Sequence, residues 1–280
     1  MHIGVMIFAT DFSIRMDELA VEVEDRGFES LFVPEHTHIP TNRESPWPGG
    51  NDLPKEYWHA YDPFVSLSFA AAKTRNLKIG TGICLLPQRD TIVTAKLVAS
   101  LDRMSAGRFI FGIGGGWNRE EMAHHGIKYH KRFARMGEQI EAMKALWTGD
   151  TADYHGEHVE FSESWSYPKP VQKPHPPILL GGESDYTLRR IVEYCDGWLP
   201  RARNGFDAKV NMARLKSFAD AAGRDFSSLS VNVFGAPADP DILAGYVDAG
   251  ISRVLLSLPS ASRDKVLPVL DRYSDIGHFG

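Results

Sequence analysis

The sequence of 280 residues has very little cysteine, with only Cys84 and Cys195. Two thiols cannot build a disulfide framework or a structural zinc site of four thiolates. Such scarcity is typical of proteins in a reducing compartment, so we expect a cytoplasmic location.

Long hydrophobic runs are also missing. The longest apolar stretches, residues 65–72 and 92–101, are interrupted by Ser, Lys or Thr. They fall short of the roughly 20 apolar residues that a membrane-spanning helix needs. Residues 1–8 carry neither a basic leader nor a signal-peptide apolar region. We therefore expect neither secretion nor membrane insertion.

An excess of positive charge is absent too, because 31 Lys and Arg stand against 36 Asp and Glu, for a net charge of −5. A mildly acidic chain is poorly suited to binding a phosphate backbone, so we expect no nucleic-acid partner. With 43% hydrophobic and 24% charged residues, the composition is that of an ordinary globular protein. No linker divides the chain, and we expect a single domain over residues 1–280.

The chain alternates short β-branched runs with longer stretches that have apolar residues at helical spacing, which is typical of βα units. The expected strands are residues 2–8, 30–33, 77–82, 108–113, 177–180, 196–199, 228–234 and 253–258. The expected helices are residues 14–26, 63–74, 91–104, 133–147, 184–194, 208–222, 240–249 and 263–273. Eight such pairs predict an α/β fold of the TIM (β/α)8 barrel type, with a doubly wound open sheet as the alternative.

Glycines follow five of these helices, where a left-handed residue commonly ends a helix. They are Gly27, Gly107, Gly149, Gly223 and Gly250. Two longer segments exceed the minimal unit and predict insertions. One, residues 34–61, follows the second strand, and the other, residues 150–176, precedes the fifth strand and predicts a short hairpin around 155–157. Segments of this length are usually functional.

Catalytic residues of a barrel of this kind follow its strands. After the second strand, Glu35 and His36 offer a carboxylate beside an imidazole, which suits proton transfer. The alternative is a solvated loop histidine. After the third strand, the Gly-rich segment 80–87 indicates either tight packing or close approach of a ligand.

Two further strand ends are rich in glycine. Residues 111–118 read FGIGGGWN, where glycine amides could admit a flat or phosphorylated ligand, although a flexible loop is the simpler reading. Residues 178–187 lead from a strand through Gly181 and Gly182 into a helix that starts at Ser184. That helix start could bind an anion, or Ser184 could act only as its N-cap.

At these positions the sequence resembles the luciferase-like monooxygenase superfamily, and in particular its coenzyme F420-dependent branch from actinobacteria. The resemblance covers nearly the whole chain. It rests on Glu35-His36, on LVASLDRMSAGR at 97–108 leading into FGIGGGW at 111–117, and on YPKPVQKPHPPI at 167–178 before Gly181-Gly182.

The resemblance implies a site for a deazaflavin at the barrel mouth. Thr81, Gly82 and Ile83 then lie at the non-prolyl cis peptide that backs the ring, at the Gly82-Ile83 bond. The phosphate and polyol chain fall to a larger set of residues, namely Gly114, Gly115, Gly116, Trp117, Gly181, Gly182, Glu183, Ser184 and Thr187. His36, with Glu35 as its neighbour, occupies the position of the base that takes the substrate proton.

Two departures bear on the ligands. The bacterial-luciferase branch, which uses reduced FMN and oxygen, has an Arg in the loop after the fourth strand, where this chain has Gly115. That difference favours F420, while Glu183, Ser184 and Thr187 resemble luciferase phosphate contacts and keep FMN open. Trp117 stands where sugar-phosphate dehydrogenases carry a catalytic Glu, so glucose 6-phosphate is a poor substrate candidate.

The resemblance therefore predicts an oxidoreductase that transfers a hydride between F420 and a small organic substrate, with His36 moving the proton. Its first alternative is an FMN-dependent monooxygenase. A metal-dependent hydrolase is a weaker one, because the pair His36 and His38 finds no further ligands at later strand ends and the neighbouring His124 and His125 suggest only a solvated surface pair. The last alternative is a non-catalytic barrel that binds a flavin without turning it over.

The insertion 34–61 carries Trp47, Tyr57, Trp58 and His59, which predict an aromatic lid over the substrate or packing against the barrel rim. The expected substrate contacts are His38, Trp58, Tyr61 and Arg201. Arg89 and Arg201 are candidates for anionic groups or plain surface charges. The resemblance further implies a homodimer, and we expect no resident metal.

Overall fold

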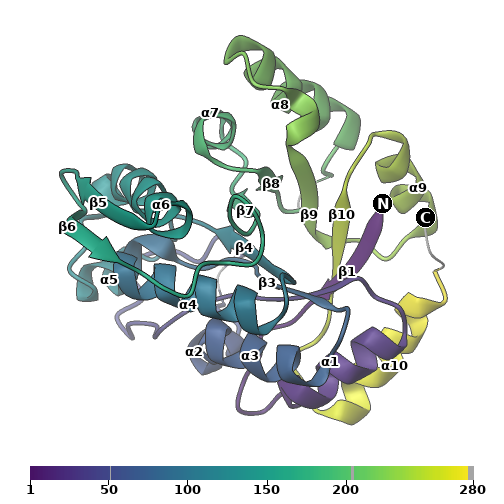
Figure 1. Ribbon diagram of the computed structural model, residues 1–280. Helices are drawn as coiled ribbons and strands as arrows, with labels where there is room; N and C mark the ends of the chain where they lie inside the picture. Colours follow the sequence, from purple (N-terminus) through teal and green to yellow (C-terminus); the bar gives the residue numbers. More distant parts are fainter. Residues whose placement is uncertain (51, 203–204, 277–280) are drawn as a thin grey trace.

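The computed structural model describes residues 1–50, 52–202 and 205–276, and over these ranges eight parallel strands close into a barrel with helices outside it (Figure 1). Their order around the barrel is β1-β10-β9-β8-β7-β4-β3-β2. The strands are β1 His2–Met6, β2 Ser30–Val33, β3 Lys78–Thr81, β4 Phe109–Ile113, β7 Ile178–Gly181, β8 Gly197–Leu199, β9 Ser230–Ala236 and β10 Arg253–Ser257. The predicted TIM barrel is confirmed, and the open sheet is wrong.

Each barrel strand is followed by a helix, as the periodicity predicts. The eight are α1 Met16–Asp25, α3 Pro63–Lys73, α4 Thr91–Met104, α6 Arg132–Thr148, α7 Asp185–Tyr194, α8 Ala208–Ala221, α9 Pro240–Asp248 and α10 Arg263–Ser274. The largest errors in a boundary are two residues. β1 ends two residues earlier than predicted, α1 starts two residues later, and β9 starts two residues later because the 3-10 turn η3, Phe226–Ser228, comes first. Within the described ranges, no helix is both long and apolar enough to cross a membrane.

Short polar side chains begin several of these helices. Asp62, Asp90 and Asp207 each accept a hydrogen bond from a backbone N–H of the first turn, at 2.8–3.0 Å. Four of the five predicted glycine stops have φ between 66° and 83°, namely Gly27, Gly107, Gly223 and Gly250. The prediction for Gly149 is wrong, since its φ is −82° and the chain runs extended into the next strand.

The barrel interior is filled by side chains. Met6, Phe32, Ile110, Leu179, Leu199 and Leu255 form one buried cluster, contributed by six of the strands. Ile83, which follows β3, and Phe234 of β9 pack against it while staying partly exposed. A closed, apolar interior leaves no channel, so a ligand has to bind at an end of the barrel.

The insertion before the fifth barrel strand is a hairpin, as predicted. β5 Thr151–His155 pairs antiparallel with β6 Glu160–Trp165 and packs on α6 at the outside of the barrel (Figure 1). The Glu138 carboxylate on α6 accepts hydrogen bonds from the backbone N–H groups of Glu157, His158 and Val159, at 2.6–3.2 Å. This carboxylate fixes the hairpin tip.

Two of the sequence motifs that carry the family resemblance, residues 97–108 and 167–178, meet in space. Asp102 of α4 is fully buried and accepts hydrogen bonds from the backbone N–H groups of Val171 and Gln172 and from the Gln172 side chain, at 2.6–3.0 Å. Gln172 also donates to the Phe109 carbonyl at 2.7 Å. The motifs therefore attach the returning segment to the start of β4, which is a structural role.

Candidate active site

The four strand ends singled out in the sequence lie on one arc of the barrel rim. They follow β2, β3, β4 and β7, and each of these strands pairs with the next. Because the strands are parallel, the segments after them gather at the same end of the barrel. Between β4 and α6 comes the short helix α5, Arg119–His124, which the sequence did not predict.

His36 is held by a carboxylate from that unpredicted helix. Its Nδ1 atom lies 2.8 Å from Oε2 of Glu121, with His36 7% exposed and Glu121 fully buried. Asn118 caps α5 by accepting from the Glu121 backbone N–H at 3.0 Å, which fixes the position of Glu121. A carboxylate only accepts hydrogen bonds, so Nδ1 carries the proton and Nε2 of the neutral ring is left as an acceptor.

Glu35 does not pair with His36, contrary to expectation. Its carboxylate accepts from the Leu85 backbone N–H and from Nε of Arg89, both at 2.7 Å. Arg89 also pairs with Asp62 at 2.5 Å. Although burial opposes the shift, the charge of Glu35 and the hydrogen bonds to Glu35 and Asp62 raise the pKa of Arg89. Glu35 thus ties the end of β2 to the segment after β3, and Arg89 has carboxylate partners of its own.

Aromatic rings surround the His36 imidazole. The ring centroid of Tyr57 lies 5.2 Å from that of His36, and the Trp117 centroid lies 5.8 Å away, edge to face. Tyr57 in turn contacts Phe8 at 4.7 Å and Trp47 at 5.7 Å. The insertion after β2 therefore packs aromatic rings against the histidine and the barrel rim, and its role as a lid over the substrate stays a prediction.

The predicted substrate contacts are only partly brought to this group. Trp58 and Tyr61 are each 49% exposed, and Trp58 lies against the ring of its neighbour His59. Tyr57, one residue before Trp58, lies against His36 in the place that was expected for Trp58. Arg201 forms a bidentate pair with Glu183 at 2.7–2.8 Å, and this hydrogen bonding raises the pKa of Arg201.

His38 joins a chain of imidazoles that leads outward from Glu121. Oγ1 of Thr37 lies 2.9 Å from Nδ1 of His38 and 2.8 Å from Nε2 of His125, and Nε2 of His38 lies 2.8 Å from Nδ1 of His124. Burial lowers the pKa of His38, and the charge of Glu121 opposes that shift only in part. His124 and His125 are therefore connected through Thr37 and His38 to Glu121, the partner of His36, rather than being an isolated surface pair.

Ile83 lies on the third strand end between two glycines. The peptide bond from Gly82 to Ile83 is cis, as the family resemblance implies. A Cβ on Gly114 would lie 2.0 Å from Cδ1 of Ile83, and one on Gly181 would lie 3.3 Å from its Cγ2. The two glycines thus leave the space that the Ile83 side chain fills. The Thr81 hydroxyl is used elsewhere, because it donates to the Gly112 carbonyl at 2.6 Å.

The loop after β4 is backed by an amide that the sequence did not single out. A Cβ on Gly116 would lie 3.7 Å from the side-chain nitrogen of Gln88. Both polar atoms of that buried side chain have no hydrogen-bond partner in the described ranges. A Cβ on Gly115 would lie 2.6 Å from the Phe133 ring. Buried polar atoms are normally paired, so Gln88 offers unused hydrogen bonds to a ligand beside this loop.

The fourth strand end begins helix α7. Ser184 accepts from the Thr187 backbone N–H at 3.2 Å and contacts the Thr187 hydroxyl at 3.0 Å. Ser184 is thus the N-cap of α7, which is one of the two roles that the sequence suggests for it. Gly182 has φ +116°, and its carbonyl accepts from Nε1 of Trp198 at 2.6 Å.

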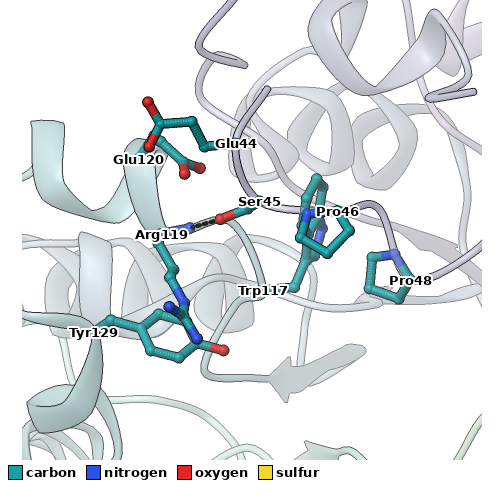
Figure 2. Close-up of a pocket in the computed structure, with 8 residues that line it drawn as sticks. All are labelled: Glu44, Ser45, Pro46, Pro48, Trp117, Arg119, Glu120 and Tyr129. Carbon is teal, nitrogen blue, oxygen red and sulfur yellow. Dashed lines mark hydrogen bonds between the residues drawn. The ribbon is translucent and has the colours of Figure 1, made fainter. Parts of the chain in front are cut away.

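A pocket of about 550 Å³ adjoins this group (Figure 2). One wall is part of the insertion after β2, and the other is the start of α5 and the segment beyond it. The lining residues are Glu44, Ser45, Pro46, Pro48, Trp117, Arg119, Glu120 and Tyr129. Trp117 belongs to both the pocket and the His36 cluster, so the pocket opens beside the candidate catalytic histidine.

In the part of the chain that the structure describes, no group of three or more His, Cys, Asp or Glu side chains is arranged to hold a metal ion. The side chains of His36 and His38 have different partners, Glu121 and the Thr37–His124 chain. The metal-dependent hydrolase therefore finds no ligand set among these residues.

Comparisons with known proteins agree with this architecture. Residues 13–238 match the family model described as luciferase-like monooxygenase. An uncharacterised protein of Mycobacterium tuberculosis (strain H37Rv) is 38% identical over 276 residues, which cover 97% of each chain. An F420-dependent hydroxymycolic acid dehydrogenase of the same organism is 27% identical over 253 residues, which cover 88% of this chain and 66% of that one. An FMNH2-dependent dimethylsulfone monooxygenase of Pseudomonas putida is 30% identical over 193 residues, which cover 67% of this chain and 52% of that one.

Solved structures share the fold over the whole chain. A monooxygenase from Streptomyces bottropensis superposes with a TM-score of 0.79 at 17% identity, covering 98% of both chains. An F420-dependent secondary alcohol dehydrogenase in complex with an F420-acetone adduct gives 0.78 at 18% identity, covering 99% of this chain and 98% of that one. At these identities the likeness is one of fold.

Proposed function

The chain belongs to the luciferase-like monooxygenase family, and on that premise we propose that it transfers a hydride between coenzyme F420 and a small organic substrate. The family contains both F420-dependent and FMN-dependent enzymes, as the relatives show. The observation that carries the proposal is the buried pair of His36 and Glu121, at 2.8 Å, on the rim of a barrel. A base with a fixed tautomer at a substrate pocket is what proton transfer requires.

In this proposal, Nε2 of His36 exchanges a proton with the substrate. Glu121 keeps the imidazole in the tautomer that has Nε2 free and stabilises the imidazolium once the proton has arrived. The rings of Tyr57 and Trp117 orient the imidazole and exclude water from it. The cofactor, when bound, supplies or accepts the hydride.

The residues at the rim fit a flat heterocycle with a polar edge. Ile83 offers a partly exposed apolar surface beside Gly114 and Gly181, and Gln88 offers an unpaired amide beside Gly116. We assign the ring to Gly82, Ile83 and Gly114 and its polar chain to the segment from Gly181 to Thr187, where the Ser184 cap begins α7. Thr81 contributes backbone only, since its hydroxyl is bonded within the barrel.

The second candidate is an FMN-dependent monooxygenase. The relative from Pseudomonas putida favours it, because that protein is FMNH2-dependent by name. Gly115 argues against FMN, because the loop has no cation of its own at this position. The Phe133 ring fills the space beside Gly115 instead. F420 therefore remains the first choice, with a homodimer and a cytoplasmic location as further expectations.

The test is titration of the purified protein with F420 and, separately, with FMN, followed by fluorescence quenching. We expect F420 to bind more tightly than FMN, and binding of FMN alone would overturn the cofactor choice. His36→Ala should retain F420 binding and lose turnover of F420 with a panel of small alcohols and ketones. His155→Ala, on the exposed hairpin, is the matched control and should behave like the wild type.

A further inference from the structure

A chain of hydrogen bonds leads from Glu121 to the surface of the barrel rim. The Oε1 atom of Glu121 accepts from the Thr37 backbone N–H at 3.1 Å and, in a long hydrogen bond of 3.4 Å, from the Thr37 hydroxyl. That hydroxyl oxygen also lies 2.9 Å from Nδ1 of His38 and 2.8 Å from Nε2 of His125. Nε2 of His38 lies 2.8 Å from Nδ1 of His124. We name Thr37, His38, His124 and His125 the histidine network, and the last two its outer imidazoles.

One placement of hydrogens satisfies all of these contacts with neutral imidazoles. A carboxylate only accepts, so the single hydroxyl hydrogen of Thr37 points to Glu121. The two nitrogens that face the hydroxyl oxygen then donate to it, namely Nδ1 of His38 and Nε2 of His125. A neutral His38 that donates from Nδ1 accepts at Nε2, so Nδ1 of His124 donates there. In this placement, each donor of the histidine network points toward Glu121.

The titratable groups that face His38 come from two segments. His36 follows β2, while Glu121, His124 and His125 lie on α5 or at its end. The rings of His38 and His124 stack, with centroids 5.1 Å apart and an interplanar angle of 10°, and the His125 centroid lies 5.6 Å from that of His38. Burial lowers the pKa of His38, Glu121 opposes that shift, and the three other imidazoles add to it. At neutral pH, His38 is therefore uncharged, as the hydrogen placement requires.

Mild acid can charge the outer imidazoles without breaking a hydrogen bond of the network. His124 is exposed, and its Nε2 atom can take a proton while Nδ1 keeps its bond to His38. His125 is partly exposed and can take a proton on Nδ1 in the same way. Positive charge at this end strengthens donation along the chain toward Glu121. A carboxylate that receives stronger hydrogen bonds there stabilises an imidazolium at His36 less well.

We propose that Thr37 and His38 are positioning residues, which hold Glu121 for its role beside His36. Through them, positive charge on the outer imidazoles weakens His36 as a base in acid. Thr37 supplies two of the hydrogen bonds to Oε1 of Glu121, and these fix the orientation in which Oε2 meets Nδ1 of His36. This inference rests on the proposed function for the reaction that His36 performs, but the histidine network can be tested without it.

The first test determines where the hydrogens are. Nitrogen NMR spectroscopy of the imidazole rings in the full chain, without cofactor at about pH 8, gives the tautomer of each histidine. Single His→Gln variants assign the signals among the 11 histidines. We expect hydrogen on Nδ1 of His38 and His124, whereas a histidine side chain in water favours Nε2. Hydrogen on Nε2 of either residue would overturn the network.

The second test separates positioning from packing. Thr37→Val keeps the branched shape and removes the hydroxyl, whereas Thr37→Ser keeps the hydroxyl, and Thr37 is exposed, so both variants should fold. For F420-dependent turnover of a small alcohol, we expect Thr37→Val to lower kcat about three- to tenfold at unchanged F420 affinity. Thr37→Ser should restore most of the rate. Wild-type kcat in Thr37→Val, or equal losses in the two variants, would overturn the positioning role.

The third test measures how charge on the outer imidazoles reaches His36. In the protein without cofactor, the His36 ring signals of the wild type should titrate in two steps between about pH 5 and 8. The double variant His124→Gln/His125→Gln should show one step. His130→Gln, exposed on the 3-10 turn η2, Tyr129–Lys131, is the matched control and should titrate like the wild type. A single step in the wild type, or two steps in the double variant, would overturn the coupling.

The proposed function and the histidine network can fail separately, because the NMR titration needs neither cofactor nor substrate. Two steps at His36 in a protein that turns over no substrate with F420 support the network and refute the proposed function. F420-dependent turnover in a protein whose His36 titrates in one step refutes the coupling and leaves the proposed function standing.

Discussion

Nδ1 of His36 lies 2.8 Å from a carboxylate oxygen of Glu121, although 85 positions separate the two residues in the chain. The two side chains are 5% and 0% exposed. Burial strengthens their hydrogen bond and gives it one geometry. Glu121 is thereby a positioning residue for the proposed base.

Glu121→Gln should lower turnover by about 100-fold or more while leaving F420 affinity unchanged. The amide can still accept the hydrogen bond from Nδ1, but it carries no charge to stabilise the imidazolium. Steady-state kinetics across pH and a binding titration measure the two effects separately, with Glu121→Asp restoring part of the rate. Wild-type turnover in Glu121→Gln would show that His36 needs no carboxylate.

Glu35→Gln should act on stability. It removes one of the two carboxylates that neutralise Arg89 and weakens the bond to the Leu85 backbone N–H. We expect a loss of about 2 kcal/mol in the free energy of unfolding, measured with urea. The exposed Glu160→Gln is the control. A variant of unchanged stability that has lost turnover would return Glu35 to a catalytic role.

Gly114→Ala should weaken cofactor binding by displacing Ile83, because its Cβ would lie 2.0 Å from Cδ1 of that residue. Ile83→Val removes this Cδ1 atom, so the double variant should bind better than Gly114→Ala alone. F420 titrations of the three variants are the measurement. Additive losses would mean that Ile83 and Gly114 do not share the ring site.

Two glycines in and just after helix α9 should respond in opposite ways to alanine. Gly245 lies inside α9 with no atom within 4 Å of a new Cβ, so Gly245→Ala should stabilise by about 0.5–1 kcal/mol. Gly250 has φ +83°, so Gly250→Ala should destabilise by about 1 kcal/mol. Urea unfolding of both variants tests the pair, and shifts of the same sign would contradict it.

The stability of the barrel should fall in acid through Glu29. Burial by itself would raise the pKa of Glu29, but hydrogen bonds and charge from Arg253 and Lys78 lower it to about 2. Because the folded pKa lies below the unfolded value of 4.5, this contribution is complete above pH 4.5 and is lost as the pH falls toward 2. Glu29→Gln should remove roughly 3 kcal/mol at neutral pH and flatten the stability curve between those limits. Unfolding free energies of the wild type and of Glu29→Gln, measured from pH 2 to 7, test this prediction.

The fold could be predicted because strand and helix periods are local properties of the sequence. The hairpin tip and four of the five glycine stops follow from equally local rules. The left-handed helix stop predicted at Gly149 is wrong, since the chain there continues extended into β5 and needs no reversal.

The site could be predicted only as far as the backbone positions it. His36 falls at a strand end, but its partner Glu121 lies on a six-residue helix within a long connection, and nothing in either segment points to the other. Adjacency in the sequence suggests that Glu35 pairs with His36, yet the structure gives the two side chains different partners, Leu85 and Arg89 for Glu35 and Glu121 for His36. Tyr57 and Trp58 share the single turn α2, Glu56–His59, whose orientation only tertiary packing sets.

The barrel closes where β1 pairs with β10, from His2 beside Arg253 to Met6 beside Ser257. The first strand of the barrel therefore cannot be paired on this edge until the last strand of the barrel has been translated. Throughout that interval the nascent chain keeps an apolar strand with one unbonded edge, which is prone to pair with other chains. Synthesis of this protein should consequently depend on chaperones that shield nascent polypeptides.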